Sequence, residues 1–145
     1  MKKKPKILIV KSRYNDTYQL FKSASLILEQ KKISFDTISV NGAFEIPVSI
    51  SRNIKKYDGF VAIGIIIKGD TPNFNLISQA ITNGLMEVAI AYRKPIGNAV
   101  LTCLNTRQAE QRNIKGKEAV EAVLDVLQPQ KEWYQKKQIA IKALE

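Results

Sequence analysis

An unbroken apolar stretch from Gly59 to Ile67 constrains the fold of this chain more than any other feature. Apolar and polar residues do not alternate in it, as they would in a strand with one face in water. A continuous apolar run of this length is typical of a strand that helices cover on both faces. It is also too short to cross a bilayer, which takes roughly 18 apolar residues. The stretch therefore predicts a buried strand, and no membrane association is expected.

Further strands and helices alternate along the rest of the chain. Apolar runs predict strands at 6–10, 33–40 and 96–102, and apolar residues at helical spacing predict helices at 20–28, 43–53, 77–88, 106–112, 116–127 and 129–144. On the third of these helices we expect Ile77, Ala80, Ile81, Gly84, Leu85 and Val88 to face inward. Such alternation implies a parallel sheet between two helical layers. We predict one α/β domain over residues 1–145, with a four-stranded parallel sheet in a three-layer α/β/α sandwich, a basic disordered N-terminus at 1–5 and a C-terminal helix at 129–145.

Histidine is absent from the chain and Cys103 is its single cysteine. The absence of histidine removes the usual acid–base group at neutral pH and the commonest metal ligand. It excludes Ser-His-Asp and Cys-His mechanisms and argues against a zinc site, so we expect no metal. One cysteine cannot form an intrachain disulfide, and a reducing cytoplasm is the simplest location.

The formal net charge of the chain is +10. Such a charge permits binding to nucleic acid or the steering of anionic substrates. The lysines are spread along the chain, however, and no basic run is interleaved with the aromatic residues typical of single-strand binding surfaces. The sequence therefore does not favour nucleic acid as a partner. A shell or scaffold whose basic face recruits anionic cargo remains an alternative.

The loop after the buried strand, Lys68 to Asn73, has the composition of an anion site. Gly69 would let the chain turn closely and let a ligand approach the backbone. Thr71 is a good N-cap, and Pro72 would then fit the first helical position. The free N–H groups at the start of that helix would bind a phosphate-sized anion. A helix that is merely well capped remains the alternative.

Three other residues are candidates on weaker grounds. Glu45 follows the second strand and could bind substrate hydroxyls, or could be an exposed acid favoured by the helix dipole. Tyr14 could stack on a planar ring or cover the edge of the core. Arg112 could reach a phosphate or only the solvent.

Four motifs, in order along the chain, resemble the lumazine synthase family of riboflavin biosynthesis. They are Arg13-Tyr14-Asn15, the segment from Gly42 to Pro47, the strand end from Gly64 to Thr71, and Pro95 to Thr102 followed by Gln108, Ala109 and Arg112. The resemblance runs in register from Ile7 to about Leu127. It implies a flavodoxin-like fold.

The resemblance also implies a reaction without metal or organic cofactor. In this family 5-amino-6-(D-ribitylamino)uracil condenses with 3,4-dihydroxy-2-butanone 4-phosphate to give 6,7-dimethyl-8-ribityllumazine and phosphate. By motif position, the residues implied in binding the pyrimidine and its ribityl chain are Tyr14, Asn15, Ala43, Phe44, Glu45, Ile66, Ile67 and Asn98. Those implied in binding phosphate are Gly69, Asp70, Thr71 and Arg112.

Family members form pentamers, and some build sixty-subunit shells. Each site then lies between neighbouring chains, so the resemblance implies that Asn98 and Arg112 come from the adjacent subunit.

Three positions depart from the family pattern. Asn73 stands where the family has a histidine thought to shuttle protons, the segment between Arg112 and Lys117 is shorter than usual, and Asn41 stands where proline is common. We expect an enzyme slowed by the loss of the histidine. The alternative is a protein that binds lumazine, riboflavin or a flavin nucleotide on the same scaffold without catalysis.

Overall fold

The computed structural model describes residues 4–70, 72–128 and 130–144, with the backbone alone for residues 130–136. Strands and helices alternate along the chain as expected. They are β1 (Ile7–Ser12), α1 (Tyr18–Gln30), β2 (Phe35–Val40), the 3-10 turn η1 (Ala43–Glu45), α2 (Ile46–Arg52), β3 (Gly59–Ile67), α3 (Asn73–Tyr92), β4 (Ile96–Cys103), α4 (Thr106–Gln111), α5 (Lys115–Leu127) and α6 (Gln130–Ala143).

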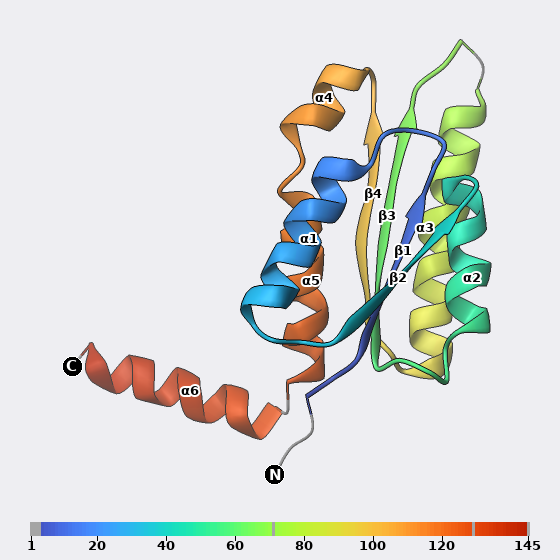
Figure 1. The fold of residues 1–145 in the computed structure, drawn as a ribbon. Coiled ribbons are helices and arrows are strands. Elements are labelled where there is room, and N and C mark those ends of the chain that lie inside the picture. Colours follow the sequence, from blue (N-terminus) through green and yellow to red (C-terminus); the bar gives the residue numbers. More distant parts are fainter. Residues whose placement is uncertain (1–3, 71, 129, 145) are drawn as a thin grey trace.

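The strands form a four-stranded parallel sheet in the order β2-β1-β3-β4. Helices α1, α4 and α5 cover one face, and α2 and α3 cover the other (Figure 1). This arrangement confirms the predicted α/β/α sandwich.

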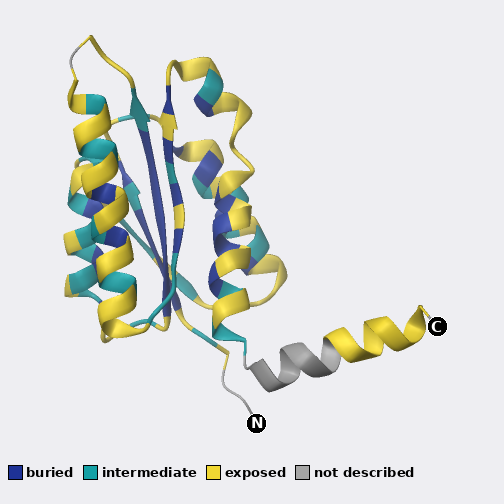
Figure 2. Ribbon diagram, turned by 180° about the vertical axis from the view of Figure 1, so that it is seen from behind, coloured by how far each residue is buried: buried dark blue, intermediate teal, exposed yellow. Residues whose placement is uncertain are grey.

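Strand β3 lies in the interior and contributes to the core on both faces of the sheet. Val61, Ile63 and Ile65 pack toward α1 and α5, whereas Phe60 and Ala62 pack toward α2 and α3. Figure 2 shows β3 buried along almost its whole length. The continuous apolar run therefore forms a strand that helices cover on both faces, as predicted.

Strand β4 has a covered face and an open one. Ala99 and Leu101 are buried, but Asn98 and Thr102 on the opposite face are exposed. This edge strand pairs only with β3 in the described sheet, and α3 leaves part of its face open.

The inward position predicted for Ala80 on α3 is wrong, because Ala80 is exposed. It lies about 100° around the helix from the buried Ile81 and so falls outside the packed stripe.

The predicted boundaries change at the start of the second strand, where β2 begins at Phe35 rather than Ile33. Lys32 adopts a left-handed conformation with φ 56°, and the N–H of Ile33 donates to Leu28 O at 2.9 Å. These are the features of a Schellman motif that ends α1. The N–H of Ile33 therefore completes the helix instead of starting the strand.

The helix expected at 43–53 is divided. Residues 43–45 form η1, and α2 follows with Pro47 in its first turn. The proline has the predicted position because its missing N–H would have no helical partner there.

The disorder expected at 1–5 falls partly on residues 1–3, outside the described part; Lys4 Nζ donates to Lys31 O at 3.1 Å. At the other end α6 projects away from the layered body (Figure 1), and its residues 137–144 are exposed. Trp133, expected on this helix, has its side chain outside the described part. No helix in the described ranges is both long and apolar enough to cross a membrane.

Candidate active site

A cleft of about 680 Å³ opens beyond the carboxyl ends of the strands. Ligands of open parallel α/β sheets bind at this edge. Three segments meet there, namely the β1–α1 loop, the turn around η1, and the end of β3 with the start of α3. The lining residues are Tyr14, Asn15, Asn41, Gly42, Ala43, Phe44, Glu45, Ile65, Ile66, Ile67, Lys68, Gly69, Asn73, Phe74 and Ile77. Segments far apart in the sequence are thus brought into one site.

Two aromatic side chains at the cleft are largely in solvent. Tyr14 is 83% exposed and Phe44 is 64% exposed. Rings exposed to this degree contribute little to the core, so the alternative that Tyr14 covers the core edge is not supported. An open aromatic ring beside a cleft can stack on a planar ligand.

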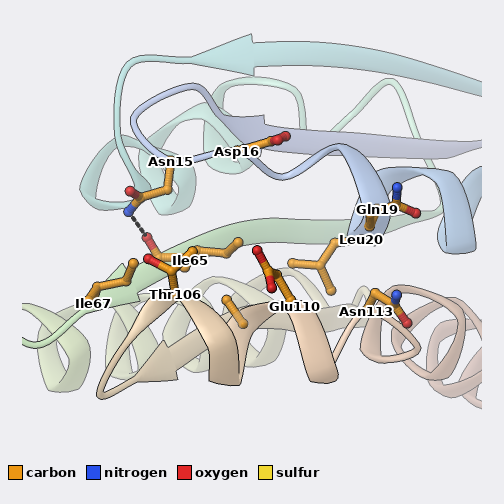
Figure 3. A pocket seen from close by; sticks show the side chains of 10 residues that line it. Asn15, Asp16, Gln19, Leu20, Ile65, Ile67, Thr106, Glu110 and Asn113 are labelled. Carbon is orange, nitrogen blue, oxygen red and sulfur yellow. Dashed lines mark hydrogen bonds between the residues drawn. The ribbon is translucent and has the colours of Figure 1, made fainter.

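Asn15 has a structural contact in addition to its place in the cleft. Its side-chain Nδ2 donates to Ile65 O at 2.7 Å (Figure 3). This hydrogen bond ties the β1–α1 loop to the end of β3 and so fixes the position of Tyr14 next to it. The role predicted for Asn15 in binding substrate stays a prediction.

The carboxylate of Glu45 is available to a ligand. Glu45 occupies the N-cap position of α2, yet its side chain makes no capping hydrogen bond. It is only partly exposed, and the described residues offer its carboxylate no other hydrogen-bond partner. A carboxylate in this position can accept hydrogen bonds from hydroxyl groups, as the predicted binding of substrate hydroxyls by Glu45 requires.

The turn around η1 lies close to β3 because β3 has a glycine at the contact. A Cβ on Gly64 would lie 3.2 Å from Ala43 Cβ and 3.2 Å from Ser12 Oγ. Ser12 is 2% exposed, and its hydroxyl has no hydrogen-bond partner among the described residues. Gly64 thus lets Ala43, which lines the cleft, lie close to β3. Ser12 was not among the predicted site residues, and its polar character at the end of an apolar strand was the signal that could have drawn attention to it.

The loop between β3 and α3 corrects two details of the predicted anion site. Helix α3 begins at Asn73, so Pro72 takes the N-cap position rather than the first helical position. Its ring offers no acceptor, and it therefore leaves the first-turn N–H groups to other partners. Gly69 has no positive φ, and a Cβ there would meet no atom within 4 Å, so the turn itself does not require glycine. Thr71 lies outside the described residues, and Asp70 is exposed and does not line the cleft.

Asn73 lines the cleft at the first residue of α3. Its side chain is exposed and its amide makes no hydrogen bond to the described residues. Lys68, which was not among the predicted site residues, lines the same cleft.

Asn98 and Arg112 lie elsewhere, along the free edge of β4. Asn98 Oδ1 accepts a hydrogen bond from Val100 N at 2.9 Å. Arg112 Nη1 donates to Thr102 O at 3.4 Å, a long contact. Neither side chain lines the cleft of its own chain.

Arg112 also influences Cys103, which is buried. Burial raises the pKa of the Cys103 thiol, and the positive charge of Arg112 opposes this rise. The thiol therefore behaves as a small apolar group of the core and not as a nucleophile.

A second cleft of about 410 Å³ lies on the other side of β3, next to α1 and α4 (Figure 3). Its lining residues are Asn15, Asp16, Gln19, Leu20, Ile65, Ile67, Thr106, Ala109, Glu110 and Asn113. Two carboxylates, those of Asp16 and Glu110, and no cationic side chain line this second cleft. It is unsuitable for a phosphate because like charges repel. The candidate anion site is thus the larger cleft. No group of three or more His, Cys, Asp and Glu side chains that could hold a metal ion occurs in the described part of the chain.

The fold and the cleft define the class of an α/β protein with a cleft beyond the carboxyl ends of its parallel strands, where ligands of such folds bind. The family model of 6,7-dimethyl-8-ribityllumazine synthase matches residues 4–131. The chain belongs to this family.

Curated relatives match over most of their length. The chain is 39% identical over 134 residues to a 6,7-dimethyl-8-ribityllumazine synthase of Bartonella tribocorum, covering 86% of this chain and 89% of the relative. The synthase of Agrobacterium fabrum is 38% identical, covering 75% and 80%, and that of Thermobifida fusca is 39% identical, covering 81% and 75%. Among solved structures, a split-gene transketolase superposes with a TM-score of 0.46 at 18% identity, over 87% of this chain and 39% of that chain.

Proposed function

We propose that the chain is a 6,7-dimethyl-8-ribityllumazine synthase, which condenses 5-amino-6-(D-ribitylamino)uracil with 3,4-dihydroxy-2-butanone 4-phosphate. One structural observation carries the proposal beyond family membership. A single cleft contains an open aromatic ring at Tyr14, an available carboxylate at Glu45 and the start of α3 at Asn73. These groups suit a planar ring, a polyol and an anion respectively.

In the proposed reaction, the 5-amino group of the pyrimidine attacks the ketone and forms an imine with loss of water. Phosphate then leaves, and the ring closes with loss of a second water. Tyr14 stacks on the pyrimidine, Ala43, Phe44 and Glu45 hold the ribityl chain, and the backbone of Ile66 and Ile67 meets the ring. The loop at Gly69, Asp70 and Thr71 binds the phosphate. Neither a metal nor an organic cofactor takes part.

Asn73 determines the expected rate. An asparagine can donate a hydrogen bond but cannot carry a proton, whereas a positioned acid–base group contributes about 10²–10⁴-fold. Holding two reactants in place can contribute more, about 7–11 kcal/mol. The enzyme is therefore slower than a relative with histidine at this position, yet active.

The proposed site includes the neighbouring subunit of a homo-oligomer, a pentamer or a sixty-subunit shell. Asn98 and Arg112 share the open edge of β4 and lie outside the cleft of their own chain. The exposed apolar residues Leu76, Met86 and Ile90 of α3 supply surface that such contacts would bury. The assembly acts in the cytoplasm, with its small-molecule substrates as partners.

A non-catalytic binder of lumazine or flavin on the same scaffold is the second candidate, and the absence of a titratable group at Asn73 favours it. Quenching of riboflavin fluorescence by the protein, without turnover, would support this alternative. A third possibility, shell-mediated recruitment of anionic cargo, rests only on the +10 charge. It predicts co-purified nucleic acid that high salt removes.

Turnover decides between these candidates. Purified protein is mixed with both substrates, and the absorbance of the lumazine product is followed. The proposal expects a rate above the uncatalysed condensation that is proportional to protein concentration. A rate equal to that of the uncatalysed reaction would reject it.

A further inference from the structure

Lys68 is the cationic side chain that one chain brings to its own cleft. Of the described residues that line this cleft, Tyr14, Glu45 and Lys68 carry titratable side chains, and only Lys68 is positively charged at neutral pH. Arg112, the phosphate clamp implied by the family resemblance, lies on the β4 edge outside this cleft. Without Lys68, the described lining residues of a single chain would offer the anion neutral hydrogen-bond donors but no positively charged side chain.

The sheet fixes the direction of the Lys68 side chain. The N–H of Lys68 donates to Cys103 O at 2.9 Å, which continues the β3–β4 ladder one residue beyond the last strand pair, Ile67 with Cys103. Alternate residues of a strand point to the same face. Gly64 lies against Ala43 and Ile66 packs with the α2 and α3 cluster, so Lys68 is the next side chain on the cleft side.

The ammonium group of Lys68 is also uncommitted, unlike that of several other lysines. Lys6 pairs with Asp36 at 3.4 Å, Lys115 pairs with Glu118 at 2.9 Å, and Lys94 Nζ donates to Ile54 O at 2.6 Å. Lys68 Nζ makes no hydrogen bond or ion pair with the described residues and is exposed. Its charge is therefore available to a ligand in the cleft.

We propose that Lys68 binds the phosphate group of the phosphorylated ketone substrate from within the same chain, opposite Arg112 of the neighbouring subunit. This inference rests on the proposed function for the identity of the substrates. The pyrimidine with its ribityl chain is uncharged, whereas a phosphate monoester carries about −1.5 to −2 charges at pH 7. A cation in the cleft therefore discriminates between the two substrates and acts on the phosphorylated one.

Lys68→Gln, Lys68→Arg and Lys56→Gln test the assignment. Lys56 is exposed in the α2–β3 connection at the opposite end of the sheet, so Lys56→Gln removes the same charge away from the cleft. The dissociation constant of inorganic phosphate is measured by ³¹P NMR titration at low salt, and the KM of each substrate by steady-state kinetics. Loss of a charge-assisted hydrogen bond should raise the phosphate dissociation constant and the KM of the phosphorylated ketone about tenfold in Lys68→Gln.

The KM of the pyrimidine should stay within a factor of about two in Lys68→Gln, because that substrate has no charge for Lys68 to meet. Lys68→Arg should restore most of the loss, and Lys56→Gln should match the unsubstituted protein. Unchanged phosphate binding in Lys68→Gln, an equal rise in both KM values, or no phosphate binding by the unsubstituted protein would overturn the assignment. Lys68-dependent phosphate binding without lumazine formation would uphold Lys68 and reject the proposed enzyme function.

Discussion

The two ends of the sheet differ in how they use polar side chains. At the amino-terminal end, Lys6 N donates to Asp58 Oδ2 at 2.7 Å and Asp58 N donates to Lys6 O at 2.8 Å. Tyr57 there donates its hydroxyl to Asp36 Oδ2 at 2.7 Å, and Lys6 pairs with the same carboxylate at 3.4 Å. The polar groups at this end satisfy one another.

At the carboxyl end, most of the comparable groups have no partner in the part of the chain that the structure describes. The carboxylate of Glu45, the ammonium of Lys68 and the amide of Asn73 make no side-chain hydrogen bond to the described residues, and the ring of Tyr14 is in solvent. Asn15 is the exception, through its hydrogen bond to Ile65 O.

This difference between the two ends indicates that polar groups at the amino-terminal end stabilise the fold, whereas those at the carboxyl end are available to bind a ligand. Groups that pair within the chain tie strands together but have little capacity left for a ligand. Groups that remain open contribute little to folding and can bind a ligand without first breaking a bond. Substitutions at the amino-terminal half should therefore change the free energy of unfolding, and substitutions at the cleft should change kinetics.

The largest effect is expected for Gly97→Ala in the amino-terminal half of β4. A Cβ on Gly97 would overlap the carbonyl oxygen of Ala119 in α5, and this backbone group cannot rotate away. Overpacking of this kind should lower the free energy of unfolding by about 3 kcal/mol, measured by urea denaturation. Gly69→Ala at the cleft is the control, and we expect nearly unchanged stability because its Cβ meets no atom within 4 Å. Similar stabilities for the two variants would contradict the difference between the two ends of the sheet.

The next largest effect is expected for Asn73→His. A group that can shuttle a proton should raise kcat by at least about 10²-fold if only that function is missing, while the melting temperature stays close to that of the parent protein. Asn75→His, on the same helix but outside the cleft, should leave kcat unchanged. Equal kcat values for Asn73→His and the parent would mean that the cleft differs from its relatives in more than this residue.

Arg112→Ala should have a smaller kinetic effect. Removing a guanidinium that contacts phosphate should raise the KM of the phosphorylated ketone about tenfold to thirtyfold, with little change in stability because the contact to Thr102 O is long. Arg107→Ala removes the same charge from α4 and should leave this KM unchanged. Identical kinetics for both arginine variants would remove Arg112 from the site.

The smallest effect is expected for Tyr57→Phe at the amino-terminal end. The Tyr57 hydroxyl, followed by the charge of Lys6, holds the pKa of Asp36 below its ordinary value of 3.8. A carboxylate whose pKa is lowered by folding stabilises the fold at pH values above its ordinary pKa. This contribution is lost as the pH falls through the lowered pKa of the folded protein. The stability difference between parent and variant should thus be present at neutral pH and shrink in acid, without any change in kcat/KM at neutral pH. The effect is small because solvent screens the interaction between Tyr57 and Asp36. A stability difference between parent and variant that grows in acid would contradict this pairing.

Much of this fold could be predicted from the sequence. The bounds of β3 follow from its apolar run, and the cleft segments follow from their positions after parallel strands. The open face of β4 could not be predicted, because strand order decides which strand lies at the edge. The position of Ala80 depends on where the helix axis lies over the sheet, which residue spacing does not specify.

Parts of the candidate site could not be predicted from the sequence either. The contact of Gly64 with Ala43 and Ser12 exists only once η1 lies across β3. Lys68 is one of 23 basic residues, and only the strand register assigns it to the cleft.

The central claim is that ligand binding takes place in the cleft at Tyr14 and Asn73 and is completed by a neighbouring chain. A crystal structure of the protein with phosphate and a non-reactive analogue of the pyrimidine substrate tests it most directly. The account predicts the pyrimidine ring stacked on Tyr14 and the phosphate near Gly69, contacted by Arg112 of an adjacent subunit. An empty cleft under saturating ligand, or an Arg112 that points away from every cleft in the assembly, would contradict it.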